Sequence, residues 1–176
     1  MSRLTTPVGE RDHVQGPADA PVTLVEYGDY ECPDCGMAYP IVKQVQARFS
    51  DRLRFVFRNF PLENVHPHAE HAAEAAEAAG AQGRFWEMHD RLFEHQKRLA
   101  GADLVDYAIA EGLDAGRFAA DLAEHRFATR VREDFMGGVR SGVNGTPTFF
   151  VNGVRHDRPW DAEGLGAAIE DALAAA

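Results

Sequence analysis

The stretch Glu31-Cys32-Pro33-Asp34-Cys35-Gly36 decides the fold, because it holds both cysteines of this 176-residue chain and joins a predicted strand to a predicted helix. The strand is indicated by the apolar, β-rich run from Val22 to Tyr27 just before it. Cysteines three positions apart on one helical turn lie roughly 5–6 Å apart at Cβ, close enough to form a disulfide. Closing so short a loop restrains the unfolded chain by only roughly 2 kcal/mol, so redox chemistry explains the pair better than structural support does.

Cys32 is the predicted nucleophile. If it is the N-cap and Pro33 is the first helical residue, free backbone amides at the positive end of the helix point at its sulfur. That environment favours the thiolate, which is the form of cysteine that attacks disulfides. Cys35 lies one turn further along and is the expected resolving thiol.

Pro33 and Asp34, the two residues between the cysteines, are the predicted tuning residues. A carboxylate beside a thiolate raises the thiol pKa, by an interaction of about 1 kcal/mol once solvent screens it. The helix end acts in the opposite direction by roughly 0.3–2 kcal/mol, so the two effects nearly cancel. We therefore predict that Asp34 makes the pair less oxidising than a histidine at that position would.

The composition limits the classes of function. A net charge of −10 argues against nucleic-acid binding, which depends largely on basic residues. The first residues, Met1 to Pro7, lack the apolar core of a signal peptide, and no segment is long and apolar enough to span a bilayer. We therefore expect a cytoplasmic protein without nucleic-acid or membrane partners, in which two lone cysteines are catalytic or metal-binding.

Glu26 is the unusual residue of the predicted strand, six positions before Cys32. A carboxylate inside a buried strand has either a partner or a functional purpose. The ordinary alternative is a glutamate at the edge of the strand that reaches solvent.

The rest of the chain predicts alternating strands and helices. Residues 1–11 form a polar and loosely held tail, and Leu53 to Phe60 alternates as a second core strand. Pro67 to Val143 is almost entirely helical. In its first helix a thin alanine stripe lies opposite glutamates that are expected to face solvent, namely Glu70, Glu74 and Glu77.

The C-terminal part carries a hairpin signal. A β-branched and aromatic run starts at Thr146, turns at Asn152-Gly153 and returns through Arg155. Asp161 is the expected N-cap of a last amphipathic helix.

These features together resemble the thioredoxin superfamily, and the inserted helices make the chain most similar to DsbA-like thiol–disulfide oxidoreductases. The matching motifs are Cys32-Pro33-Asp34-Cys35, Asn59-Phe60-Pro61-Leu62, Gln82 to Asp90 and Gly145 to Gly153, in that order. The resemblance implies an α/β, thioredoxin-like fold built from residues 12–62 and 145–176. An all-helical subdomain, residues 63–144, is inserted between its βαβ and ββα halves.

The resemblance also implies roles for individual residues. Pro147 is expected in cis, and the main chain at Thr146 is expected to pair with the substrate as an added strand. Glu26 matches the buried acid that exchanges protons with Cys35, with a pKa raised by desolvation. The implied partners are protein thiols and disulfides or glutathione, and no cofactor is expected beyond a redox-active Cys32–Cys35 disulfide. Exported members of the family carry histidine at the Asp34 position, so the direction, oxidase or reductase, stays open.

Three other functions fit parts of the sequence. A glutathione-dependent transferase or isomerase of the same fold, such as the kappa-class transferases, holds a glutathione thiolate at the helix start and needs no resolving Cys35. A zinc-binding module could use both cysteines with His66, His68 and His71, although their spacing matches no compact zinc motif. A chaperone-like binder would use an apolar groove. His89, between Phe85 and Phe93 on one helical face, is expected to be a packed core residue.

Overall fold

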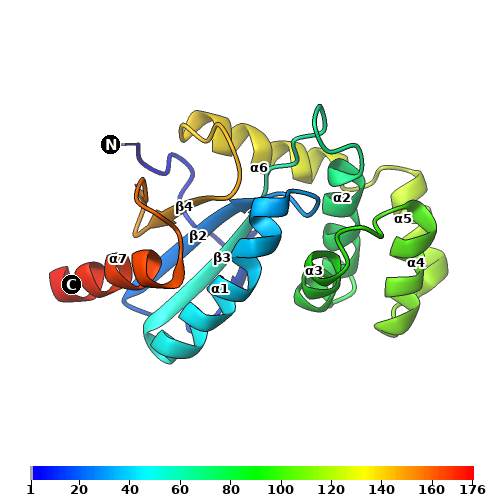
Figure 1. Cartoon of the computed structure of the whole chain (residues 1–176). Helices are drawn as coiled ribbons and strands as arrows, with labels where there is room; N and C mark the ends of the chain where they lie inside the picture. Colours follow the sequence, from blue (N-terminus) through cyan, green and yellow to red (C-terminus); the bar gives the residue numbers. More distant parts are fainter. Residues whose placement is uncertain (1) are drawn as a thin grey trace.

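A mixed five-stranded sheet forms the centre of the computed structural model, which describes residues 2–176 (Figure 1). Its strands are β1 (His13–Gln15), β2 (Val22–Gly28), β3 (Leu53–Asn59), β4 (Thr148–Val151) and β5 (Val154–Arg155), in the order β1-β3-β2-β4-β5. Strands β2 and β3 run parallel and are joined by the crossover helix α1 (Pro33–Phe49), whereas the other pairs are antiparallel.

Two layers of helices cover the sheet. Alternate residues of β3, among them Phe55 and Phe57, face the core formed with α1 and α7 (Ala162–Ala175). On the opposite face, Val25 and Val56 pack in a smaller core beneath α6 (Ala128–Arg140). The alternation predicted for the second strand therefore describes its two faces correctly.

The predicted inserted region is helical and contains α2 (Ala69–Gly80), α3 (Phe85–Glu94), α4 (Gly101–Ala110), α5 (Ala115–Ala123) and α6. Figure 1 shows α2 to α5 gathered beyond one end of the sheet, while α6, in yellow, returns along it. The ring of Phe135 on α6 stacks on Phe60, which follows β3, with 4.3 Å between centroids. The inserted region thus supplies one of the two layers that cover the sheet.

The prediction that the glutamates of α2 face solvent was wrong for two of them. Glu74 is 2% exposed and Glu77 is 5% exposed, because α3, α5 and α6 pack around α2. Partners compensate the buried charge: His13 Nε2 lies 2.9 Å from the Glu77 carboxylate, and His125 Nδ1 lies 3.1 Å from Glu74 Oε1. The alanine-rich sequence allows neighbouring helices to approach α2 from several sides.

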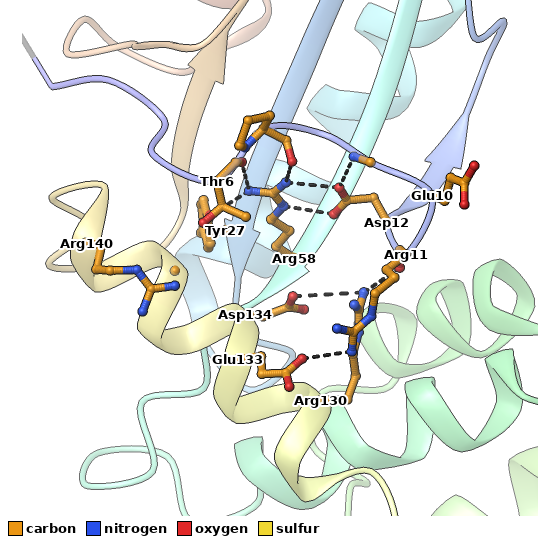
Figure 2. Close-up of a pocket in the computed structure, with 13 residues that line it drawn as sticks. Thr6, Glu10, Arg11, Asp12, Tyr27, Arg58, Arg130, Glu133, Asp134 and Arg140 are labelled. Carbon is orange, nitrogen blue, oxygen red and sulfur yellow. Dashed lines mark hydrogen bonds and ion pairs between the residues drawn. The ribbon is translucent and has the colours of Figure 1, made fainter.

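The N-terminal segment is held more firmly than expected, and of the predicted tail only Met1 lies outside the described residues. Arg58, 3% exposed, donates hydrogen bonds to the main-chain oxygens of Thr6 at 2.8 Å and Pro7 at 3.1 Å (Figure 2). It also pairs with both carboxylate oxygens of Asp12, at 2.8 and 3.0 Å. Beside these contacts is a cavity of about 430 Å³, partly lined by Tyr27, which alternates with Glu26 and so faces the other side of the sheet.

The C-terminal predictions are confirmed. Strands β4 and β5 are joined by Asn152 and Gly153, whose φ values of 47° and 80° are those of a type I′ turn. The Asp161 side chain accepts a hydrogen bond from the Gly164 amide at 2.7 Å and caps α7. Among the helices of residues 2–176, none combines the length and apolar character needed to cross a membrane.

Candidate active site

The two cysteines lie where β2 passes into α1. Cys32 is the N-cap, with an extended backbone conformation (φ −70°, ψ 123°), and Pro33 is the first residue of the helix, as predicted. The Cys32 amide donates to the carbonyl of Asp29 at 3.2 Å, and the Cys32 carbonyl accepts from the Gly36 amide at 3.0 Å. Both cysteines are reduced thiols in this structure.

The environment makes the two sulfurs unequal. A hydrogen bond from the Cys35 thiol lowers the pKa of Cys32 to about 6, against the opposing effect of burial and with help from Thr146 and from the backbone amides of Cys35 and Asp34. Burial raises the pKa of Cys35 well above its ordinary value. Cys32 is 6% exposed and Cys35 is 0% exposed. At neutral pH the outer sulfur is therefore mainly a thiolate, and the inner one keeps its proton.

The loop before β4 lies against Cys32. The Thr146–Pro147 peptide bond is cis. The Cys32 thiol donates to the Thr146 carbonyl oxygen over 3.5 Å, so the structure brings together sequence positions that are 114 residues apart. The Thr146 hydroxyl oxygen is buried and has no hydrogen-bond partner among residues 2–176. It favours the thiolate, since Thr146 lowers the pKa of Cys32.

Replacing Thr146 with valine is expected to raise the pKa of Cys32. The shapes of the two side chains are nearly the same, so the main loss is one hydrogen bond to the thiolate, worth about 0.5–1 pH unit. Thiolate absorbance at 240 nm, followed against pH, measures the change. Thr146→Ser keeps the hydroxyl and is the matched control; equal pKa values in Thr146→Val and the wild type would exclude this role.

Glu26 lies under the cysteine pair with little contact with solvent. It is 2% exposed, and its Oε1 atom is buried without a hydrogen-bond partner in the described part of the chain. Burial first, and the negative charge of Cys32 second, raise the pKa of Glu26 to about 8. Its own charge raises the pKa of Cys35. The carboxyl group is therefore poised to take up and release a proton near neutral pH.

Asp29 is a buried carboxylate near the cysteines whose role the sequence did not indicate. Asp29 is 1% exposed and accepts hydrogen bonds from the amides of Glu31 at 2.8 Å and Leu62 at 2.9 Å. Its Oδ2 atom also lies 2.8 Å from Nδ1 of His66. Asp29 thus ties the cysteine loop to the segment that follows β3. Its position three residues before Cys32 was the only signal in the sequence.

Two of the three histidines that suggested zinc, His66 and His68, are directed to carboxylates. His66 pairs with Asp29, and His68 Nδ1 lies 2.8 Å from Glu31 Oε2. Within residues 2–176, no three histidine, cysteine or acidic side chains are grouped so that they could hold a metal ion.

His89 is a packed core residue, as predicted. It is 3% exposed, and its Nδ1 atom lies 2.9 Å from the Tyr30 hydroxyl oxygen. Burial lowers its pKa well below the ordinary value, so the ring is neutral.

The family follows from the comparisons with known proteins. The family model described as thioredoxin matches residues 9–171, and the chain belongs to this family. The chain also shares its fold with DsbA proteins, among them α-DsbA1 from Wolbachia pipientis, which is 17% identical with a TM-score of 0.81, covering 98% of this chain and 95% of its own. BdbD from Bacillus subtilis, in its oxidised form, is 28% identical with a TM-score of 0.88, covering 98% of each chain. A thioredoxin-like oxidoreductase from Silicibacter pomeroyi is 26% identical with a TM-score of 0.84, covering 96% of this chain and 95% of its own.

A longer relative matches at higher identity. The Na⁺/H⁺ antiporter NhaA 1 of Salinispora arenicola is 54% identical over 172 residues, which are 97% of this chain and 26% of the antiporter. The chain therefore spans about a quarter of the length of the curated relatives that it matches.

Proposed function

We propose that this protein exchanges disulfides with protein thiols through Cys32 and Cys35. The observation that carries the proposal concerns two thiols at the start of one helix. The pKa of Cys32 is lowered to about 6, whereas the pKa of Cys35 is raised well above its ordinary value. One sulfur is prepared to attack, and the other is kept protonated until it is needed.

The proposed cycle uses three residues. The Cys32 thiolate attacks a client disulfide, a mixed disulfide forms, and one client sulfur leaves and takes a proton. Cys35 then gives its proton to the Glu26 carboxylate and attacks the Cys32 sulfur. The Cys32–Cys35 disulfide forms, the second client thiol is released, and two electrons have passed to the client. Oxidation of a client dithiol runs through the same steps in reverse.

Thr146 and Pro147 are proposed to hold the client. The Thr146 carbonyl oxygen lies 3.5 Å from the Cys32 sulfur, so a main chain that pairs with this loop places its own sulfur beside the nucleophile. A protein client suits this arrangement because an extended segment supplies backbone hydrogen bonds on both sides of its cysteine.

The glutathione-transferase alternative leaves two features without a purpose. Such an enzyme activates the thiol of a bound glutathione and requires neither a resolving cysteine nor a proton acceptor beneath it. Here Cys35 is 0% exposed, and Glu26, which is 2% exposed, raises the pKa of Cys35 through its charge. A disulfide-exchange cycle uses both of them.

The test is an equilibrium titration in glutathione redox buffers, followed by alkylation and mass measurement. We expect one two-electron transition between dithiol and disulfide. Its midpoint gives the reduction potential of the pair, and comparison with the redox potential of a compartment shows whether the protein oxidises or reduces its clients there. The Cys32→Ser variant is the control and should show no intramolecular disulfide. A wild-type pair that stays in one state at every glutathione ratio would contradict the proposal.

Asp34→His is expected to raise the reduction potential in the same titration. The change removes a negative charge beside the Cys32 thiolate and adds a positive one when the histidine is protonated, which stabilises the reduced form and corresponds to about 20–40 mV. Asp34→Asn separates the loss of the negative charge from the gain of the histidine. A potential that is unchanged or lower in Asp34→His removes Asp34 from the tuning residues.

A further inference from the structure

The side-chain amide of Gln96 bridges two peptide groups of the cysteine loop. Gln96 lies in the turn after α3, and its Nε2 atom donates to the carbonyl oxygens of Tyr30 at 3.0 Å and Cys32 at 2.8 Å. A primary amide carries two N–H donors, so one nitrogen serves both carbonyls. These peptide groups flank Glu31 and immediately precede the helix.

Gly36 provides the space for that amide. A Cβ atom at Gly36 would lie 2.1 Å from Gln96 Oε1 and 2.6 Å from its Cδ, distances that contacting atoms do not reach. Glycine is less favourable than alanine inside a helix. Its presence in the first turn of α1 is explained by the amide that lies over it.

Contacts on both sides of Gln96 hold its turn in place. Phe93, at the end of α3, packs on the ring of Tyr30 with 4.8 Å between centroids. Beyond Gln96, the Arg98 amide donates to the carbonyl of His95 at 2.8 Å, and the Tyr107 hydroxyl donates to the Arg98 carbonyl at 2.6 Å. The amide therefore reaches the loop from a rigid support in the inserted region.

The held carbonyl belongs to the peptide that starts α1. The Cys32 carbonyl oxygen accepts from both Gln96 Nε2 and the Gly36 amide, at 2.8 and 3.0 Å. Keeping this oxygen turned toward Gln96 leaves the amides of Asp34 and Cys35 directed at the Cys32 sulfur, where they stabilise its negative charge.

We propose that Gln96 is a positioning residue for the thiolate of Cys32, acting through the peptide groups of Tyr30 and Cys32, and that Gly36 is present to admit its amide. The inference rests on the proposed disulfide exchange and adds a residue of the inserted region to that site. It assigns Gln96 no contact with the client.

Two different substitutions remove the same contact. Gln96→Ala deletes the amide, and Gly36→Ala displaces it while leaving Gln96 in the chain. Each is expected to raise the pKa of Cys32 by about 0.5 pH unit. At pH values below that pKa, the thiolate fraction then falls about threefold, so alkylation by iodoacetamide is about threefold slower. Each should also shift the glutathione equilibrium about threefold toward the disulfide form, because the reduced form loses stabilisation.

The double variant and the matched controls decide the cause. If both changes act through one contact, Gln96→Ala combined with Gly36→Ala gives no more than the single threefold effect. Gln96→Glu keeps the size of the side chain but loses the N–H donors, so it should shift the pKa at least as far as Gln96→Ala. Lys97→Ala, in the same turn and exposed, should leave the wild-type pKa unchanged.

The outcomes separate this inference from the proposed function. Independent, multiplied effects of about ninefold in the double variant, or unchanged Cys32 titration in folded Gln96→Ala, overturn the positioning role. A lower melting temperature with an unchanged alkylation profile shows support of the fold alone and also overturns it. The alkylation profile requires no exchange activity, so it remains decisive if the wild-type pair fails to equilibrate with glutathione.

Discussion

The Cys35→Ser variant is expected to accumulate mixed disulfides with its protein clients, whereas the Cys32→Ser variant is expected to form none. Cys32 can still attack in the first variant, but no resolving thiol remains to release the client. In the second variant, the remaining thiol is 0% exposed and its pKa is raised by burial, so it is a poor nucleophile. Turnover should fall by about 10³-fold or more in both variants, since each lacks one half of the dithiol.

Gel electrophoresis without reductant measures the trapped complexes, and their loss on adding reductant identifies them as disulfides. A double variant with serine at both positions controls for non-covalent association. Complexes formed equally by the two single variants would contradict the assignment of Cys32 as nucleophile. Full turnover in either of them would exclude the cycle.

Glu26→Gln is expected to slow the resolution step about 10²-fold or more at pH 7, because the variant has no group beneath Cys35 to accept its proton. The difference from the wild type should shrink in alkaline solution, where hydroxide removes that proton directly. The rate at which a preformed mixed disulfide releases its client measures this step alone. Equal release rates at pH 7 exclude Glu26 as the proton acceptor.

The same substitution should change how the stability of the reduced protein depends on pH. The pKa of Glu26 rises from 4.5 to about 8 on folding, so between these values the folded chain keeps a proton that the unfolded chain has lost. The contribution of Glu26 to the free energy of unfolding therefore falls as pH rises through this window, by about 5 kcal/mol in total, and is constant above it. Cys32 acts in the opposite direction, since its pKa falls from 9.0 to about 6.

The comparison of Glu26→Gln with the wild type largely cancels the contribution of Cys32. The stability advantage of the variant should grow from pH 5 to pH 8 and then level off. Urea unfolding of both proteins in reductant at several pH values measures it. An advantage that is the same at pH 5 and pH 9 contradicts a raised pKa at this position.

Features coded by neighbouring residues could be predicted from the sequence. An apolar, β-rich run indicated β2, and alternating apolar residues indicated β3. The Asn152-Gly153 pair indicated the β4–β5 turn, and Pro33 after Cys32 indicated where α1 begins. Each signal acts within a few residues, so it keeps its meaning whatever the rest of the chain does.

Features coded by distant contacts could not be predicted from the sequence. Gln96 contacts a loop 64 residues earlier in the chain, and nothing in its own turn distinguishes it from a solvent-facing glutamine. The burial of Glu77 depends on His13, Asn59 and Arg130, which come from three other segments. The DsbA-like resemblance indicated the order of the elements but did not indicate such pairings.

The position of α6 limits how this chain can be shortened. A truncated protein that joins residue 62 directly to residue 145 would retain every strand, the two cysteines and the loop of Pro147. It would nevertheless leave part of one side of the sheet bare, because Val25, Val56 and Phe150, now 0–1% exposed, belong to a cluster that loses Phe135 and Val143 with the excised segment. Such a minimal version invites aggregation through that bare surface, so the insert cannot be treated as a detachable accessory.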